Sequence, residues 1–197
     1  LNVRQTFGES AETFDYSKIK KPEYDFEKIY KPETLNKQII TNINAKDVFK
    51  YMNLQMLIGK HLGMKWVISD LLSKKDPKAM KIYNEILDII NHGDEYFDIK
   101  AIYKYYPCRK NGEKIEILSD DLSEVLETFE FPRQTWGQYL SLNDYIHPTE
   151  IDYIGMFVVS AGEKSRIVSN ELISKGEFYR GHLVNSLGLE LAESVAE

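Results

Sequence analysis

Three observations predict an α+β fold for this chain of 197 residues. Residues 99–106 and 114–118 flank Asn111-Gly112, a pair suited to the positive φ angles of a hairpin turn. Residues 152–160 are rich in β-branched and aromatic side chains, which is typical of a central strand. Elsewhere, apolar residues recur at helical spacing. Strands and helices in mixed order, with a hairpin, favour α+β over a doubly wound sheet.

The N-terminal region predicts an extended segment before the folded domain. Two Lys-Pro pairs punctuate residues 1–34, and a residue that precedes proline avoids the helical conformation. We therefore expect an extended arm over 1–34, followed by one domain over 35–197. An early strand is expected within 35–43.

The first expected helix begins after Asn44, a good N-cap residue, and ends near Gly59 or Gly63. Its apolar stripe at helical spacing comprises Ala45, Val48, Phe49, Met52 and Met56. A second helix is expected to start at Asp76-Pro77, because proline is well tolerated in the first helical turn, and to stop at Gly93.

Two further helices are expected in the second half of the chain. One covers residues 122–129. The other runs to the C-terminus after Ser174 and Glu177, which have the spacing of a capping box. Its inward stripe comprises Leu183, Leu187, Leu191 and Val195.

The overall composition restricts the classes of function. The net charge of -6 argues against a nucleic-acid partner, because binding phosphates needs a basic surface. A single cysteine suits a reducing compartment, and no apolar run is long enough to cross a bilayer. These features predict a cytoplasmic location. The lysines between Lys60 and Lys81 form either a solvated face or a docking patch for an acidic protein.

Common catalytic signatures are absent from the sequence. It contains no phosphate loop, dinucleotide fingerprint or nucleophile elbow. The histidines lack zinc-site spacing and are expected to be exposed or hydrogen-bonded: His61, His92, His147 and His182. Cys108 precedes Arg109 and Lys110, which would lower the pKa of a thiol, yet no base is evident. A structural cysteine is favoured, and an enzyme built on Cys108 stays an alternative.

Six segments, in order within residues 39–197, resemble the activation domain of cobalamin-dependent methionine synthase. They are YMN (51–53), IYKYYPCRKNGEKIEIL (102–118), FPRQ (131–134), SLNDYI (141–146), DYIGMFVVSAG (152–162) and LAESVAE (191–197). The best of them, DYIGMFVVSAG, is similar to the family's DYIGxFxVTxG strand. The order and spacing make the set more specific than any single segment.

This resemblance implies a twisted antiparallel sheet flanked by helices and a role in reactivation. The family's domain binds S-adenosylmethionine and covers a partner domain that carries cobalamin, when the cobalt has been oxidised. An electron from a flavodoxin-like donor then allows the sulfonium methyl group to restore methylcobalamin. The chain would be a module of a methyltetrahydrofolate–homocysteine methyltransferase, and we do not expect it to be catalytic alone.

The resemblance also implies two ligand-binding positions, Asn53 and Glu193. The family binds the charged amino-acid end of its ligand with carboxylates and a forked arginine. Asn53 stands where the family has one carboxylate, and Glu193 matches the other. Two alternatives stay open: Asn53 lines only a wet helical face, and Glu193 belongs with Glu190 and Glu197 to a solvated acidic stripe. No catalytic or metal-ligating residue is assigned.

The family's arginine and tyrosine lie in an Arg-Pro-x-x-Gly-Tyr motif downstream of the last matched helix. This chain ends at Glu197, before such a motif. We expect either a fragment or a shortened homologue that lacks the C-terminal part of the family's domain. A second functional interpretation follows: a non-catalytic module that docks on a corrinoid protein without binding S-adenosylmethionine.

Overall fold

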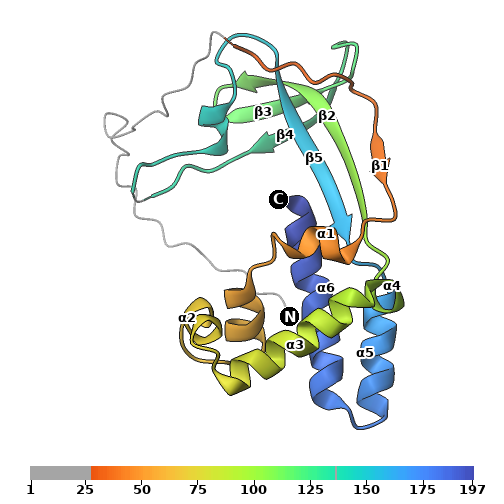
Figure 1. The fold of residues 1–197 in the computed structure, drawn as a ribbon. Helices are drawn as coiled ribbons and strands as arrows, with labels where there is room; N and C mark the ends of the chain where they lie inside the picture. The colour runs from red at the N-terminus through yellow and green to blue at the C-terminus, as the bar shows by residue number, and fades with distance from the viewer. Residues whose placement is uncertain (1–27, 136) are drawn as a thin grey trace. The chain divides into compact units, whose positions relative to one another are not determined.

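The computed structural model describes residues 28–135 and 137–197, and Figure 1 shows their helices and strands. The chain divides into two units. Unit 1 comprises the described residues up to Leu35 together with Tyr106–Ile154, and unit 2 comprises Asn36–Tyr105 and Gly155–Glu197. Most of the expected N-terminal arm lies outside the described residues, so the arm and its boundary stay predictions.

Five strands form one sheet, and the α+β prediction is confirmed. They are β1 (Gln38–Ile40), β2 (Lys100–Asn111), β3 (Lys114–Leu118), β4 (Val125–Glu130) and β5 (Asp152–Ser160). β2 pairs antiparallel with β1 and with β3, and β3 pairs antiparallel with β4. The expected hairpin is present, with Asn111 opposite Lys114 and Gly112 at φ +61°.

Two strand-level predictions were wrong. Residues 122–129 do not form a helix: Leu122 has φ 64°, and the residues after it form β4 on the edge of β3. Apolar residues at 122, 125, 126 and 129 have helical spacing, but antiparallel pairing with β3 makes the segment a strand. β5 was expected to be central, yet its partner among the described residues is β2 and its side chains are half-buried or exposed.

The expected first helix is interrupted. The N-cap is confirmed, because Asn44 Oδ1 accepts the N–H of Lys46 at 2.9 Å, but α1 covers only Ala45–Phe49. Asn53 then starts the π-helix η2 (Gln55–His61), with its Oδ1 accepting the Met56 N–H at 3.1 Å. Asparagine competes in this way with a continuous helix, because its side chain substitutes for a backbone acceptor.

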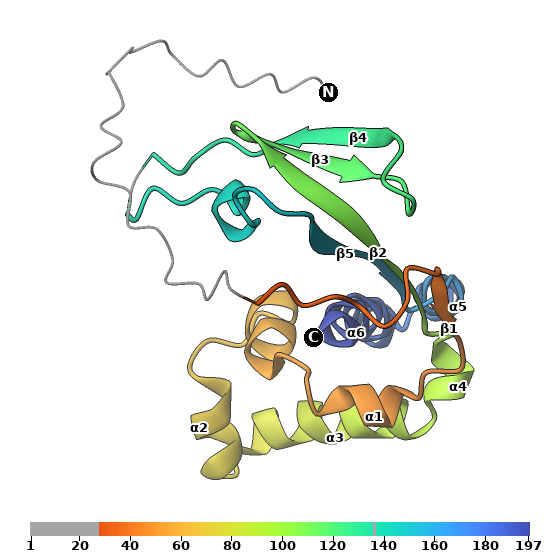
Figure 2. The ribbon, with the colours of Figure 1, turned by 90° about the horizontal axis from the view of Figure 1, so that it is seen from above.

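The remaining helices of unit 2 are α2 (Ile68–Ser73), α3 (Pro77–Asn91), α4 (Gly93–Tyr96), α5 (Lys164–Ser174) and α6 (Phe178–Ala196). The start of α3 is confirmed, since Asp76 Oδ1 accepts the N–H groups of Lys78 and Ala79. α1 packs against both α3 and α6 (Figure 2). No described helix is both long and apolar enough to cross a membrane.

The last helix is present, but its predicted capping box was wrong. Ser174 is the final residue of α5, where its Oγ donates to the Glu171 carbonyl at 2.7 Å. The chain then turns through Gly176, at φ +84°, and α6 starts without a side-chain cap. α5 and α6 pack closely at Gly181, where an added Cβ would lie 2.8 Å from the Ser169 carbonyl oxygen.

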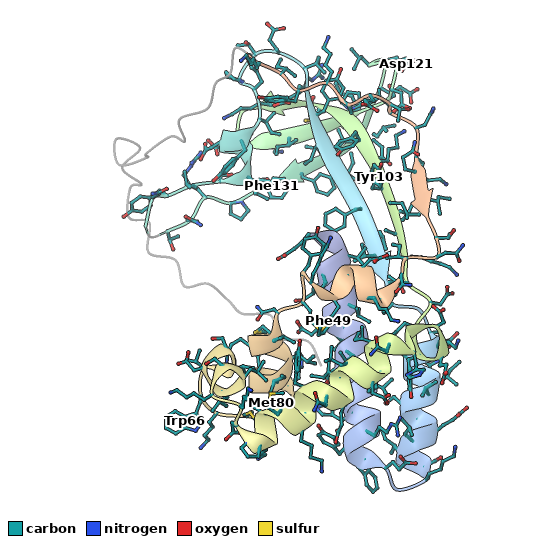
Figure 3. The ribbon with its side chains drawn as sticks, viewed as in Figure 1. Phe49, Trp66, Met80, Tyr103, Asp121 and Phe131 are labelled. Atoms are coloured by element: carbon teal, nitrogen blue, oxygen red, sulfur yellow. The ribbon has the colours of Figure 1, made fainter. Side chains whose placement is uncertain are left out.

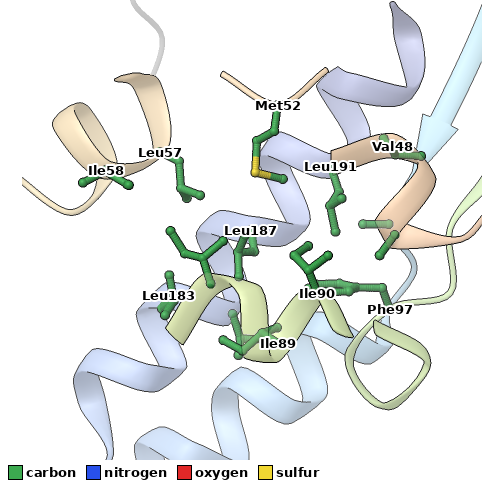
Figure 4. Close-up of a cluster of buried hydrophobic side chains, with 14 of the residues drawn as sticks. Val48, Met52, Leu57, Ile58, Ile89, Ile90, Phe97, Leu183, Leu187 and Leu191 are labelled. Atoms are coloured by element: carbon green, nitrogen blue, oxygen red, sulfur yellow. The ribbon is translucent and has the colours of Figure 1, made fainter. Parts of the chain in front are cut away.

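The core of unit 2 gathers around α6 (Figure 4). Leu183, Leu187 and Leu191 are fully buried, as the stripe predicts. They belong to one cluster of buried residues with side chains from α1, η2, α3 and the segment between α1 and η2, including Val48, Met52, Leu57, Ile58, Ile89 and Ile90. Burial of a leucine side chain is worth roughly 1.5–3 kcal/mol, so α6 is the main scaffold of this unit.

Candidate ligand-binding site

A pocket of about 520 Å³ lies in unit 2, within the range typical of small-molecule sites. α1, β1, β2, β5 and the end of α6 all contribute to its lining. The lining residues are Ile40, Ile43, Val48, Tyr51, Ala101, Tyr103, Tyr105, Gly155, Met156, Phe157, Val159, Ser194, Val195, Ala196 and Glu197. The wall is therefore largely apolar and aromatic, with polar groups from α6.

The aromatic wall is built by strand alternation. Tyr103 and Tyr105 are two residues apart on β2, so their side chains share a face, and their rings meet edge-to-face at 5.9 Å. Figure 3 labels Tyr103 on this strand. Gly155 on β5 gives the Tyr105 ring its place, since an added Cβ would lie 3.1 Å from Tyr105 Cε1. Phe157 continues the wall and is exposed.

Asn53 and Glu193 adjoin this pocket in sequence but do not line it. Tyr51, two residues before Asn53, is a lining residue, and so is Ser194, directly after Glu193. Both Asn53 and Glu193 are exposed. The Asn53 Oδ1 atom already accepts the Met56 N–H, as described above. Their ligand roles therefore stay predictions.

Glu190 does not belong to a solvated acidic stripe. Its side chain is 2% exposed, whereas Glu193 and Glu197 on the same helix are exposed. His61 Nε2 at the end of η2 donates to Glu190 Oε1 at 2.9 Å. Burial raises the pKa of Glu190, and the hydrogen bond from His61 opposes that rise in part. Periodicity missed this contact, because the partner is 129 residues away.

The histidines are hydrogen-bonded, as expected. Their contacts are His61 with Glu190, His182 Nε2 with the His61 carbonyl at 2.9 Å, His92 Nδ1 with the Asp88 carbonyl at 2.8 Å, and His147 Nδ1 with the Glu150 N–H at 2.8 Å. No group of three or more histidine, cysteine or acidic side chains that could hold a metal ion occurs in the described part of the chain.

The structure argues against a nucleophilic role for Cys108. The thiol is fully buried in unit 1. Burial, and then the nearby charge of Asp152, raise its pKa to about 12. A reactive cysteine needs a partly exposed thiol with a lowered pKa, so the alternative of an enzyme built on Cys108 fails.

Unit 1 contains a polar cluster where the segments FPRQ and SLNDYI meet. Arg133 contacts both carboxylate oxygens of Asp144, at 2.5 and 2.9 Å. The Ser141 N–H also donates to Asp144, which completes a capping box for the 3₁₀-helix η3 (Leu142–Tyr145). Burial alone would raise the pKa of Asp144, but these hydrogen bonds outweigh it and the pKa is lowered. The cluster joins two matched segments.

Comparisons with known proteins bear on the family and the fold of this chain. The family described as "Vitamin B12 dependent methionine synthase, activation domain" matches residues 36–197. The methionine synthase of Mycobacterium tuberculosis (strain H37Rv) is 30% identical over 107 residues, which are 49% of this chain and 9% of that protein. The Mycobacterium leprae methionine synthase is 27% identical over 107 residues, with the same shares.

A solved structure, the MetH reactivation domain bound to AdoHcy, shares the fold at a TM-score of 0.73 and 18% sequence identity. The match covers 83% of this chain and 54% of that one. The chain thus spans about half of the solved domain and less than a tenth of the curated relatives. Since the family match extends over most of the sequence, the chain belongs to the activation-domain family of vitamin B12-dependent methionine synthase.

Proposed function

We propose that this chain is a reactivation module that binds S-adenosylmethionine in the aromatic pocket of unit 2. The observation that carries the proposal is the position of the pocket. Its walls include Tyr51 and Ser194, which adjoin the two family-matched positions Asn53 and Glu193. The solved relative binds AdoHcy, the product that S-adenosylmethionine becomes on losing its methyl group.

The lining suits the chemistry of this ligand. A sulfonium cation is attracted to the face of an aromatic ring, and an adenine ring stacks on one. Tyr103, Tyr105 and Phe157 provide such rings, whereas Lys50 Nζ already lies over the Tyr51 ring, 4.8 Å from its centroid. Glu193, exposed beside the pocket residue Ser194, would attract the ligand's ammonium group, and Asn53 would accept a hydrogen bond without the assistance of a charge.

In this role the chain positions the methyl donor, and a bound cofactor elsewhere accepts the methyl group. Cobalamin on a partner domain would supply the cobalt to which the methyl is transferred. The residues of this chain orient the sulfonium and cover the site against water. We place this activity in the cytoplasm, as the single-cysteine composition favours.

A flavodoxin-like electron donor is the second proposed partner, and its docking surface would be the lysine-rich face of unit 2. Trp66 is 81% exposed on this face and lies at φ 92°, an uncommon conformation for tryptophan (Figure 3). Gln55 holds the strained loop, since its side chain accepts the Ile68 N–H at 2.8 Å and donates to the Trp66 carbonyl at 3.2 Å. The surrounding lysines, including Lys65 and Lys78, would steer an acidic partner.

Calorimetric titration with S-adenosylhomocysteine, a stable product analogue, tests the ligand claim. We expect binding by the native chain. Glu193→Gln should bind at least about tenfold more weakly, since a lost charge-assisted contact costs roughly 1.5–3 kcal/mol, and Tyr105→Leu should bind several-fold more weakly, since a lost ring–cation contact costs about 1 kcal/mol. Glu171→Gln, an exposed acid on α5, is the matched control and should bind normally. Equal binding by all four proteins would refute the assignment of the pocket.

One observation favours the alternative of a docking module that binds no S-adenosylmethionine. The Asn53 Oδ1 atom is already engaged by the Met56 N–H, which leaves it less available to a ligand. This alternative predicts capture of a cobalamin-loaded partner domain together with no heat on titration. Heat from the native chain excludes it.

A further inference from the structure

The buried acid of α6 has no role in the proposed ligand contacts, yet it links the two segments that carry them. Glu190 is 2% exposed, and its Oε1 accepts a hydrogen bond from His61 Nε2. His61 is the last residue of η2, and the same helix begins just after Asn53. η2 packs against α6, so the contact joins the two helices at a fixed point.

Two hydrogen bonds join the end of η2 to α6. Besides the bond to Glu190, the His61 carbonyl accepts a hydrogen bond from His182 Nε2 at 2.9 Å. At its other end, η2 is fixed by Asn53, whose Oδ1 accepts the Met56 N–H. A π-helix is rare, and such turns occur often at functional sites. Its register against α6 is thus set by polar contacts as well as by the buried Leu57 and Ile58.

Glu190 is also tied to the part of α6 that reaches the pocket. Ser194 Oγ donates to the Glu190 carbonyl at 2.6 Å, and Ser194 lines the pocket. Glu193 lies three residues after Glu190, less than one helical turn along α6. A displacement at Glu190 would therefore be transmitted to the residues at the pocket.

The choice of residue here is costly for stability. A buried acid that shares one hydrogen bond with a histidine is expected to stabilise a fold less than a leucine of similar volume. Its presence at the join between η2 and α6 calls for a role other than packing.

We propose that the His61–Glu190 hydrogen bond is a positioning contact that holds η2, with Asn53 at its start, in register with the Glu193 segment of α6. The inference rests on the proposed function, because it concerns the geometry of the same ligand site. His61 and Glu190 are positioning residues and do not touch the ligand.

Substitution of Glu190 separates this role from packing. Glu190→Leu removes the acceptor and fills the space, whereas Glu190→Gln keeps an oxygen that accepts from His61. We expect Glu190→Leu to keep or raise the thermal midpoint and to weaken binding of S-adenosylhomocysteine about tenfold, as coupled contacts do. Glu190→Gln should retain native binding. Leu189→Ala, an exposed neighbour on α6, is the matched control.

A ligand-free measurement accompanies the titration. Amide hydrogen exchange over Gln55–His61 should quicken in Glu190→Leu, and in His61→Leu as a second variant, but not in Glu190→Gln. Unchanged exchange and unchanged binding in both leucine variants would overturn the inference. If the native chain binds no S-adenosylhomocysteine, the proposed function fails, while the exchange rates alone decide whether the contact holds η2 in place.

Discussion

Two buried carboxylates, one in each unit, are held in opposite ways. Asp144 in unit 1 is 5% exposed, and both of its oxygens contact the Arg133 guanidinium. Glu190 in unit 2 is 2% exposed, and one oxygen accepts from His61. Accordingly, the pKa of Asp144 is lowered and that of Glu190 is raised.

The contacts of Asp144 account for its burial, whereas those of Glu190 do not. Asp144 joins the FPRQ and SLNDYI segments with a forked ion pair and a helix cap, so both of its carboxylate oxygens accept hydrogen bonds. Glu190 has a weaker set of partners and lies beside the proposed ligand segment.

The largest effect is expected for Asp144→Ala. Removing one partner of a buried ion pair costs about 3–5 kcal/mol, and the lower end applies here because Arg133 keeps its longer pair with the exposed Glu113 at 3.4 Å. The cap of η3 is lost as well. Urea unfolding of the native and variant chains measures the difference. If the unfolding free energy fell by less than about 1 kcal/mol, the Arg133–Asp144 pair would contribute no more than an ordinary surface ion pair.

An intermediate effect concerns the pH dependence of stability, and the two acids should give opposite signs. The folded-state pKa of Asp144 is lowered from 3.8, so its contribution is present above that value and is lost as pH falls through the folded pKa. The folded-state pKa of Glu190 is raised from 4.5, so its contribution is present below 4.5 and is lost as pH rises through the folded pKa.

Neutral substitutions isolate these two contributions. Asp144→Asn should flatten the fall of the unfolding free energy below pH 3.8, and Glu190→Gln should remove the fall above pH 4.5. Thermal unfolding across pH 2–8 records both. A native-like profile in either variant would contradict the environment assigned to that acid.

The smallest effect is expected for Arg166→Ala. Arg166 pairs with Glu163 three residues earlier, and both side chains are more than 60% exposed. Pairs of this kind contribute about 0.5 kcal/mol or less, and the contribution declines with salt. Urea unfolding of the native chain and of Arg166→Ala, with and without 1 M sodium chloride, measures this contribution. It gives the stability effect of an exposed ion pair, against which the effects at the two buried acids are compared.

Sequence reasoning succeeded where the cause is local. The Asn111-Gly112 turn and the Asp76 cap depend on neighbours within a few residues, and both are present. The stripe of α6 was visible for the same reason, since one helix carries it. β4 was missed because a pairing with β3 overrides its helical spacing.

The candidate site was only partly predictable. The two tyrosines at 103 and 105 signal a shared strand face, yet nothing local shows that Gly155 and α6 complete a pocket around them. Likewise, helical spacing places Glu190 and Glu193 on one face, but it cannot show that Glu190 is buried and hydrogen-bonded to His61. Long-range contacts determined both features.

The most direct test of the account is a titration of the isotope-labelled chain with S-adenosylhomocysteine, followed through the chemical shifts of assigned backbone amides. We predict that the perturbed amides cluster at Tyr51, Tyr105, Gly155 and residues 193–197. A second hollow in unit 2, between α3 and α6 and lined by Met80, Glu85, Tyr179 and Arg180, provides the internal comparison. Perturbation there, or none in the aromatic pocket, would contradict the account.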